Sequence, residues 1–405
     1  MTDISVAGGT GNGSGFAGAS VAVQEAVAKA GQNLVERAAL VETIALAAVA
    51  GEHLLVIGPP GTAKSEAVRR IARAIGGSYF EYLLGRFTEP SEIFGPVDLR
   101  KLREGVVETE TAGMLPEAEF AFLDEIFQGS TAILNTLLGV LNERVFRRGH
   151  TQMPVPLRVC VGASNALPQD EALAAFADRF LLRVFVEPVP DPRLEDLLEG
   201  GWRANREETQ ATFGASLADV DVLARAARQA DLAAVRPLLA QAVRLLRQGG
   251  IHLSDRRAVR TQRLVAAAAV LAGRTEATGA DLWPVVLAVP TPDEQAQARD
   301  LLRDLLARTQ NDTLPSAAEE ASFGPLARAA RLVKAGEEAV GVPLPAEAEA
   351  REAWRLRLEG IVRETDAGFT PEKTPPALTD IRRRIADALE AARQAGPGTR
   401  GFDLG

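Results

Sequence analysis

Eight consecutive residues have types and a spacing suited to binding phosphate: Gly58-Pro59-Pro60-Gly61-Thr62-Ala63-Lys64-Ser65. They follow the short apolar run Leu54–Ile57 and precede a segment of helical periodicity, Glu66–Ile75, which predicts a buried strand, a turn and a helix in that order. In such a loop, backbone N–H groups and the helix N-terminus attract phosphate oxygens. We expect all eight residues to bind nucleotide, with Lys64 on the β- and γ-phosphates and the Ser65 hydroxyl on Mg²⁺.

One position departs from the usual pattern G-x-x-x-x-G-K-[ST], because Ala63 stands where glycine is customary. Alanine is the smallest replacement, but a positive φ at this position would cost it energy. The alternative interpretation of the segment is a tight turn whose lysine merely faces solvent.

Two adjacent acids, Asp124 and Glu125, end the apolar run that begins at Phe120. Ligands of open α/β sheets bind at the carboxyl ends of the strands. We therefore expect Asp124 to hold Mg²⁺ opposite Ser65, and Glu125 to orient and polarise the attacking water. A strand followed by two acids is common by chance. The pattern indicates a hydrolytic site only because it follows the phosphate-binding segment Gly58–Ser65 in the sequence.

Three further residues could complete a hydrolytic site. Asn165 follows the apolar run 159–163 and can bond the γ-phosphate or the water, although asparagine also favours ordinary turns. Arg179 could stabilise transition-state charge in a neighbouring subunit, or could pair with Asp178. Arg256, at the start of a predicted helix, could bind the phosphates in the same chain, or could simply be a solvated residue.

Short apolar runs alternate with helical segments up to about residue 192, which predicts a doubly wound parallel sheet. Beyond it the pattern is helical only. We expect a flexible, glycine-rich tail over 1–20, an α/β nucleotide-binding core over 21–192, an all-helical lid over 193–308 and a C-terminal helical region of unknown role over 309–405.

The composition is that of an ordinary globular protein, with 46% hydrophobic and 24% charged residues and a net charge of −9. This acidic balance weighs against nucleic acid as a partner. The single cysteine, Cys160, lies in an apolar run and excludes a disulfide framework. No apolar stretch is long enough for a membrane span, and no signal peptide is visible, so we expect a cytoplasmic protein.

Taken in order, these elements resemble an AAA+ ATPase, more narrowly the MoxR branch and its RavA subgroup. The similarity is strong over about residues 30–290. The segments that carry it are Gly58–Ser65, Phe94–Pro96, Leu115–Glu119, Phe122–Phe127, Ala132–Leu138, Leu141–Arg144, Ala163–Asn165, Asp178–Phe180 and Leu253–Arg257. The alanine before the lysine is similar to what this subgroup shows.

The resemblance implies strand order 5-1-4-3-2, ATP with Mg²⁺ as cofactors and a hexameric ring in which Arg179 acts in the neighbour's site. It also implies two substrate-binding hairpins, over about 94–113 and 145–156. Relatives are similar to chaperone-type ATPases that work with a von Willebrand factor A (VWA) domain protein, while the client protein stays unidentified. The alternative is an AAA+ motor acting on nucleic acid, for which Arg144, Arg147, Arg148 and His150 form the one basic patch.

Overall fold

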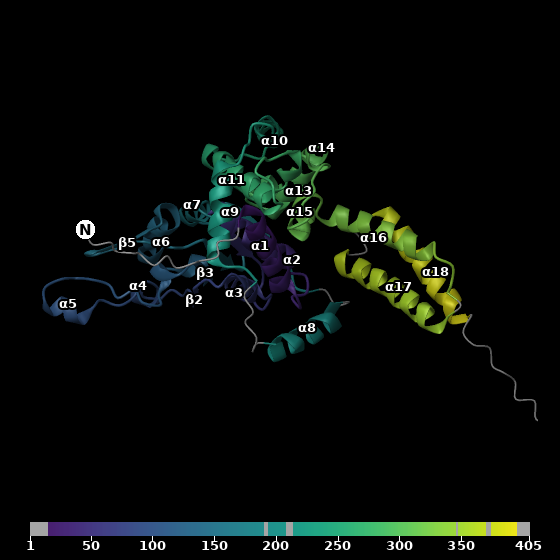
Figure 1. The fold of residues 1–405 in the computed structure, drawn as a ribbon, viewed down its shortest axis with the longest axis horizontal. Coiled ribbons are helices and arrows are strands. Elements are labelled where there is room, and N and C mark those ends of the chain that lie inside the picture. The colour runs from purple at the N-terminus through teal and green to yellow at the C-terminus, as the bar shows by residue number, and fades with distance from the viewer. Residues whose placement is uncertain (1–14, 190–192, 208–213, 346, 370–373, 395–405) are drawn as a thin grey trace, which may run out of the picture. The chain divides into compact units, whose positions relative to one another are not determined.

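The computed structural model describes residues 15–189, 193–207, 214–345, 347–369 and 374–394 (Figure 1). Contacts divide the chain into two compact units. The first comprises Met1–Pro188 with Arg206–Ser322, and the second comprises Val189–Asn205 with Phe323–Gly405. Within the described residues, no helix combines the length and the apolar character needed to cross a bilayer.

The first unit is built on a parallel sheet of five strands. These are β1 (Leu54–Ile57), β2 (Tyr79–Leu83), β3 (Phe120–Asp124), β6 (Val159–Ser164) and β7 (Leu182–Phe185). Their order across the sheet is β2-β3-β6-β1-β7. All neighbours are parallel, so the carboxyl ends of the five strands lie at one edge.

Strand β2 was not among the apolar runs that sequence analysis identified. It forms one edge of the sheet, and the side chains of Tyr79–Leu83 are half-buried or exposed. A continuous apolar run is typical only of strands covered on both faces. The edge position therefore explains why the sequence pattern gave no signal for this strand.

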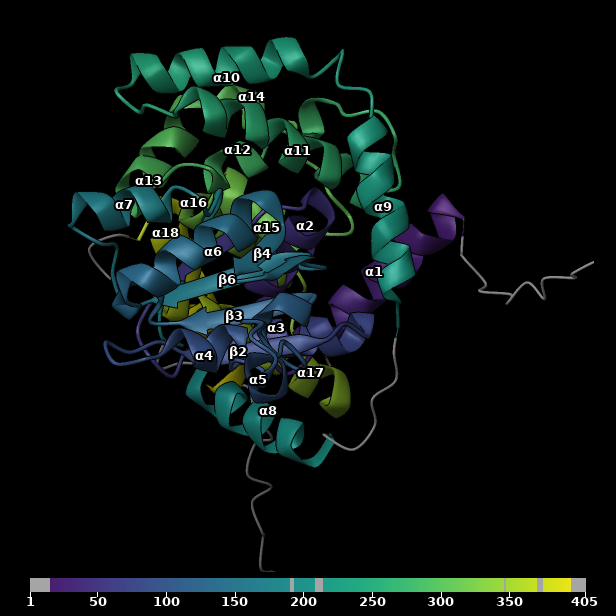
Figure 2. The same ribbon diagram turned by 90° about the vertical axis from the view of Figure 1, so that its left-hand side faces the viewer.

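The central strands bury both faces. Side chains alternate along a strand, so Leu54 and Val56 face one layer, and Leu55 and Ile57 face the other. The first layer contains α1 (Phe16–Gly31), α2 (Ala38–Ala50) and α3 (Lys64–Ile75), and the second contains α4 (Pro90–Phe94), α6 (Thr131–Glu143) and α7 (Glu171–Ala177) (Figure 2). This is the doubly wound arrangement that the alternating pattern predicts.

The N-terminal tail expected over 1–20 needs a correction. Residues 1–14 lie outside the described residues, but helix α1 already begins at Phe16. Ala19 and Val23 on one face of this helix are fully buried, and the Ser20 hydroxyl donates to the Leu271 carbonyl at 3.0 Å. The burial of this face stabilises helix where the glycine content of the preceding residues suggested a tail.

Helices follow β7 in the rest of the first unit. They are α9 (Leu217–Gln229), α10 (Arg236–Gln248), α11 (Asp255–Leu271), α12 (Pro284–Leu287), α13 (Pro292–Leu301), α14 (Arg303–Leu306) and α15 (Pro315–Ser322). Their apolar residues share one core with α1–α3. Helix α15 contacts α2, where the Glu42 carboxylate accepts the Ala317 N–H at 2.7 Å, and it thus lies with the first unit beyond the lid boundary expected at 308.

Two loops of the first unit join to form one projection, which we call the arm and define as residues 95–113 and 145–154. It contains α5 (Leu99–Arg103) and the antiparallel strands β4 (Val145–Arg148) and β5 (Thr151–Pro154) (Figure 1). The His150 N–H donates to the Val107 carbonyl at 3.0 Å, and the Thr109 N–H donates to Thr151 Oγ1 at 2.7 Å. The two loops are therefore bonded to each other.

The second unit contains α8 (Leu194–Glu207) except for its last two residues, together with α16 (Pro325–Val340), α17 (Ala348–Gly368) and α18 (Pro376–Gln394). The last three share a core of their own, which includes Leu332, Leu358 and Ile381. Gly336 permits close approach, since a Cβ on it would lie 2.5 Å from the Ile381 side chain.

Candidate functional site

The segment Gly58–Ser65, called the phosphate loop after the ligand expected of it, connects β1 to α3, as the sequence predicts. Gly61 has a φ of 76°, and Ala63, just before the helix, has φ 57° and ψ 28°, which is left-handed backbone. Gly58 has no room for a side chain, because a Cβ there would lie 2.2 Å from the Val186 carbonyl oxygen. The cost anticipated for alanine at position 63 is therefore present in the fold.

Lys64 lies inside this loop rather than in solvent. Its side chain is buried, and Nζ donates to the carbonyl oxygens of Gly58 and Pro59, each at 2.8 Å. Burial lowers the pKa of Lys64, whereas the negative charges of Asp124 and Glu125 act on that pKa in the opposite direction. The ammonium group thus lies close enough to the two carboxylates for their charges to act on it.

Glu125 is held in a defined position at the end of β3. Its backbone has φ 46° and ψ 46°, and its N–H donates to Asp124 Oδ1 at 3.0 Å. Asn165, just after β6, donates from Nδ2 to Glu125 Oε1 at 2.7 Å. Left-handed backbone at a non-glycine residue is uncommon and gathers at functional sites. Lys64, Asp124, Glu125 and Asn165 therefore meet at the carboxyl edge of the sheet.

The loop and these acids fit a nucleotide with its metal. The N-terminus of the twelve-residue helix α3 faces the loop, which is a favourable place for phosphate. Ser65 is the second residue of this helix, and Asp124 ends β3 at the same edge of the sheet. A hydroxyl and a carboxylate are oxygen ligands of the kind that Mg²⁺ prefers.

Arg37 also belongs to this site and was missed by sequence analysis. It immediately precedes α2, and its Nε donates to the Thr62 carbonyl oxygen of the phosphate loop at 2.7 Å. No motif surrounds it in the sequence. A lone arginine between two helical segments gave no signal, because its partner lies 25 residues away.

Arg179 lies apart from the phosphate loop, between α7 and β7. The salt bridge with Asp178 considered above does not form, because Asp178 pairs with Arg257 at 2.8 Å instead. Arg179 Nε is buried and has no hydrogen-bond partner within the described ranges. Its guanidinium is thus not engaged in an ion pair by the described part of its own subunit.

Arg256 and Arg257 are adjacent in the sequence but differ in burial and in bonding partners. Arg256 is exposed and donates to Asn142 Oδ1 at 2.7 Å. Its pKa is lowered mainly by partial burial, and further by the nearby positive charges of Arg179 and Arg260. None of these neighbours belongs to the phosphate loop. The expectation that Arg256 binds phosphate in its own chain stays a prediction.

Arg257 is a buried structural side chain. It is 2% exposed and donates to the carbonyl oxygens of Leu181 at 2.6 Å and of Ala288 at 2.8 Å, in addition to its ion pair with Asp178. It thus ties α11 to the segment that enters β7. Ser254 caps the helix by accepting the Arg257 N–H, so the charged pair after it lies in the first turn.

We expect Arg257→Met to lower the free energy of unfolding by about 3 kcal/mol, because several buried carbonyl groups and Asp178 would lose their donor. Arg256→Met should change it by less than about 0.5 kcal/mol, since that side chain is exposed. Urea unfolding followed by circular dichroism would measure both. Equal effects of the two substitutions would contradict the distinction.

The basic patch proposed for nucleic acid is not a continuous surface. Arg144 turns inward to the Gly51 carbonyl, Arg147 pairs with Glu143, and Arg148 donates to the Gly95 carbonyl at 2.8 Å. Burial lowers the pKa of Arg144 to about 10. Of these arginines, two hold backbone carbonyls of the first unit, which is a structural role.

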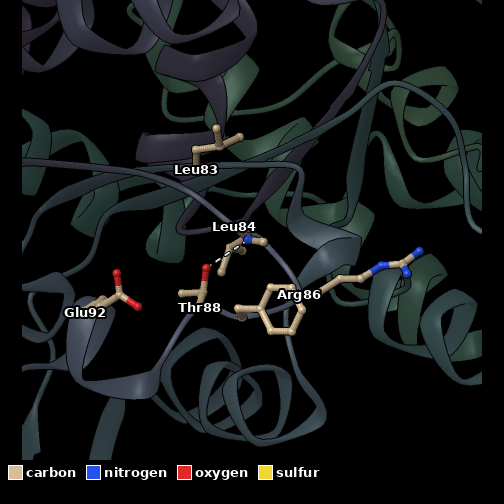
Figure 3. A pocket seen from close by; sticks show the side chains of 7 residues that line it. Leu83, Leu84, Arg86, Thr88 and Glu92 are labelled. Carbon is tan, nitrogen blue, oxygen red and sulfur yellow. Dashed lines mark hydrogen bonds between the residues drawn. The ribbon is translucent and has the colours of Figure 1, made fainter.

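A shallow hollow lies just after β2 and is separate from the phosphate loop. It is lined by residues 83–88 and Glu92, and the Gly85 N–H donates to Thr88 Oγ1 at 2.9 Å across it (Figure 3). The Arg86 side chain extends away from Thr88 and Glu92. Leu83 is 65% and Phe87 is 95% exposed, so this edge of the unit presents apolar side chains to solvent.

Comparison with known proteins gives one family match. The model described as the MoxR domain in the MoxR–vWA–β-propeller ternary systems matches residues 21–225, slightly more than half of the 405 residues. The matched region includes the phosphate loop, Asp124, Glu125, Asn165 and Arg179.

Relatives agree with this match. Two uncharacterized proteins of Methanocaldococcus jannaschii are each 37% identical over 242 residues, which cover 59% of this chain and 62% or 64% of theirs. Chaperone MoxR1 of Mycobacterium tuberculosis is 28% identical over 196 residues, covering 47% of this chain and 51% of that protein. The chain thus spans less than two thirds of the length of the curated relatives that it matches.

A solved structure shows the same fold. It is that of a candidate ATPase from Cytophaga hutchinsonii, with a TM-score of 0.57 and 17% sequence identity, covering 72% of this chain and 96% of that one. At this identity the likeness concerns the fold.

Proposed function

The chain belongs to the MoxR domain family of the MoxR–vWA–β-propeller ternary systems, and from that premise we propose that it hydrolyses Mg-ATP to remodel another protein. The observation that carries the proposal is the meeting of Lys64 with Asp124, Glu125 and Asn165 at one edge of the sheet. A binding module would need only the loop, whereas the positioned carboxylate and amide are suited to activating water.

Each residue of the site would have its own role in ATP hydrolysis. The loop Gly58–Ser65 would surround the phosphates, and Lys64 would exchange its two carbonyl partners for phosphate oxygens. Ser65 and Asp124 would hold Mg²⁺, which supplies positive charge against the phosphates when bound. Glu125 would orient the attacking water, and Asn165 would hold Glu125 at the correct angle while bonding the water or the γ-phosphate.

The site is proposed to be shared between subunits of a hexameric ring. Transition-state charge on the γ-phosphoryl group needs a cation besides Lys64. Arg179 supplies a guanidinium whose Nε makes no hydrogen bond to any residue that the structure describes. The charge of Arg179 is close enough to lower the pKa of Arg256, and we propose that both arginines enter the neighbour's site, with Arg179 as the essential group. Hydrolysis would then depend on contact between subunits.

The partner is proposed to be a VWA-domain protein, since the family is described from systems that contain one. The arm would contact the client. Leu99 and Leu102 on α5 are 69% and 45% exposed at its surface, which is favourable for binding an apolar segment. The RavA-like grouping, the cytoplasmic location, and the division into core, lid and C-terminal region stay predictions.

The ATPase rate per subunit should rise as a larger fraction of the protein assembles into rings. We expect the ATPase rate per subunit to increase at least about tenfold as the protein is concentrated through its assembly range, because Arg179 reaches a site only in the ring. Light scattering on the same samples would give the subunit number. A rate per subunit that stays constant from monomer to ring would contradict a shared site, and no ATP hydrolysis in either state would contradict the function.

A further inference from the structure

Arg37 is a buried cation bonded to backbone carbonyl oxygens, one of them in the phosphate loop. It is 5% exposed, and its guanidinium donates to Thr62 at 2.7 Å, to Glu187 at 2.7 Å and to Glu36 at 2.6 Å. The first bond holds the phosphate loop and the second holds the chain just after β7. The same side chain thus bonds two distant segments, of which the second lies 150 residues after Arg37 itself.

The bond to Thr62 determines how the Thr62–Ala63 peptide is turned. The chain has no cis peptide bond among the described residues, and in a trans peptide the C=O and N–H point to opposite sides. With its carbonyl oxygen on Arg37, the peptide directs the Ala63 N–H away from Arg37. That N–H donates no backbone hydrogen bond within the described residues, so it is available to a ligand.

Ala63, which follows this bonded carbonyl, adopts left-handed backbone. Its φ of 57° is a conformation that glycine adopts freely and alanine does not. Glycine is the usual residue at this place in a phosphate loop. Here the loop has a residue that resists the required conformation, next to a buried guanidinium that bonds the preceding carbonyl.

We propose that Arg37 is a positioning residue for the phosphate loop, which holds the Thr62–Ala63 peptide so that the Ala63 N–H faces the phosphates. The inference rests on the proposed nucleotide binding and explains how alanine is accommodated before Lys64. Arg37 itself touches no phosphate and acts through the peptide. Its effect on binding should therefore depend on the residue at position 63.

The test measures the dissociation constant of a fluorescent ATP analogue with Mg²⁺ for the full chain and its variants. Arg37→Gln should weaken binding about tenfold, the ratio expected from losing a charged hydrogen bond. Adding Ala63→Gly to Arg37→Gln should restore binding to within about threefold of the original chain, because glycine adopts the left-handed conformation without support. Ala63→Gly alone is measured beside them as the reference for the double variant.

Arg70→Gln is the matched control. Arg70 also donates to the segment before α2, at the Gln32 carbonyl, but it makes no bond to the phosphate loop. It should leave binding within about threefold of the original chain. Hydrogen exchange of residues 58–65 without nucleotide gives a second measurement, and protection of this segment should fall in Arg37→Gln and not in Arg70→Gln.

The outcomes separate this inference from the function on which it rests. If the original chain binds no nucleotide, the proposed function fails, and exchange at 58–65 still tests the role of Arg37. If the original chain binds and Arg37→Gln binds equally well, the inference is overturned. Weak binding that Ala63→Gly does not rescue overturns it too, because Arg37 would then act through its charge.

A second variant covers a loss of folding in Arg37→Gln. Arg37→Lys keeps the positive charge, but its single ammonium group cannot reproduce the planar guanidinium that bonds Thr62 and Glu187 together. Weakened binding that Ala63→Gly restores would support positioning, and unchanged binding would overturn it.

Discussion

Replacing Glu125 by glutamine should reduce the ATPase rate at least about a hundredfold while ATP binding stays within about threefold, because the amide cannot accept the proton of the attacking water. The geometry should survive the change. Asn165 Nδ2 donates to Glu125 Oε1, and a glutamine oxygen can accept the same hydrogen bond. The substitution thus removes the charge and keeps the contact.

Phosphate release and equilibrium binding of the ATP analogue would be measured on the same preparation. Glu119→Gln is the matched control, because Glu119 lies before the other end of β3 and accepts the Ser78 N–H at 2.6 Å. It should hydrolyse ATP at close to the rate of the original chain. If Glu125→Gln hydrolyses as fast as Glu119→Gln, another group activates the water.

The Glu125 variant would also help to identify the client, since a subunit that binds ATP without hydrolysing it should hold its client longer. Proteins retained by Glu125→Gln and not by Lys64→Ala, which is expected not to bind nucleotide, would be candidates.

Removing Arg179 should lower the ATPase rate about a thousandfold, at the lower end of the effect of an arginine that stabilises transferred phosphate. The free energy of unfolding should change little. Arg179 has no ion pair among the described residues, and its neighbour Asp178 is bound by Arg257. Arg147→Ala is the control, because this arginine is exposed on the arm and its ion pair within the described part of the chain is with nearby Glu143.

Mixing two inactive variants would show whether Arg179 acts in its own subunit or in the neighbour. Lys64→Ala retains Arg179 but lacks a working phosphate loop, and Arg179→Ala has the opposite defect. In random rings, about a quarter of the interfaces would combine an intact loop with an intact arginine, since each head-to-tail interface takes one group from each subunit. Recovery of ATPase activity would support the shared site, and no recovery in mixed rings would place Arg179 in its own subunit's site or outside any site.

Arg257 is buried and Arg256 is exposed, and this difference bears on how nucleotide state could be communicated within the first unit. Arg257 ties α11 to the residues that flank Arg179, through Asp178 and the Leu181 carbonyl. A shift of α11 would therefore move the segment that carries Arg179. This connection is a property of one subunit and follows from contacts inside the first unit.

Much of the site could be predicted from the sequence, because its signals are local. A run of four apolar residues followed by a glycine-containing loop and a helix needs only neighbouring residues to specify it, and β1 and α3 occur where that pattern places them. Asp124 and Glu125 end an apolar strand for the same reason. Because the strands pair in parallel, their carboxyl ends lie at one edge of the sheet.

The remaining features depend on residues far apart in the chain, and for these the tertiary structure was needed. Strand β2 exists by pairing with β3, and α1 begins at Phe16 because its apolar face is covered by other elements. Whether Arg256 or Arg257 is buried depends on the carbonyls near β7.

The phosphate loop shows the division most clearly. The local pattern specifies where the loop lies, which lysine and hydroxyl it contains, and that Ala63 is strained if its φ is positive. The positive φ at Ala63, and the hydrogen bond from Arg37 to the Thr62 carbonyl 25 residues later, are visible only in the folded chain. A backbone conformation and a hydrogen bond between distant segments both arise from packing, which no local pattern of residues records.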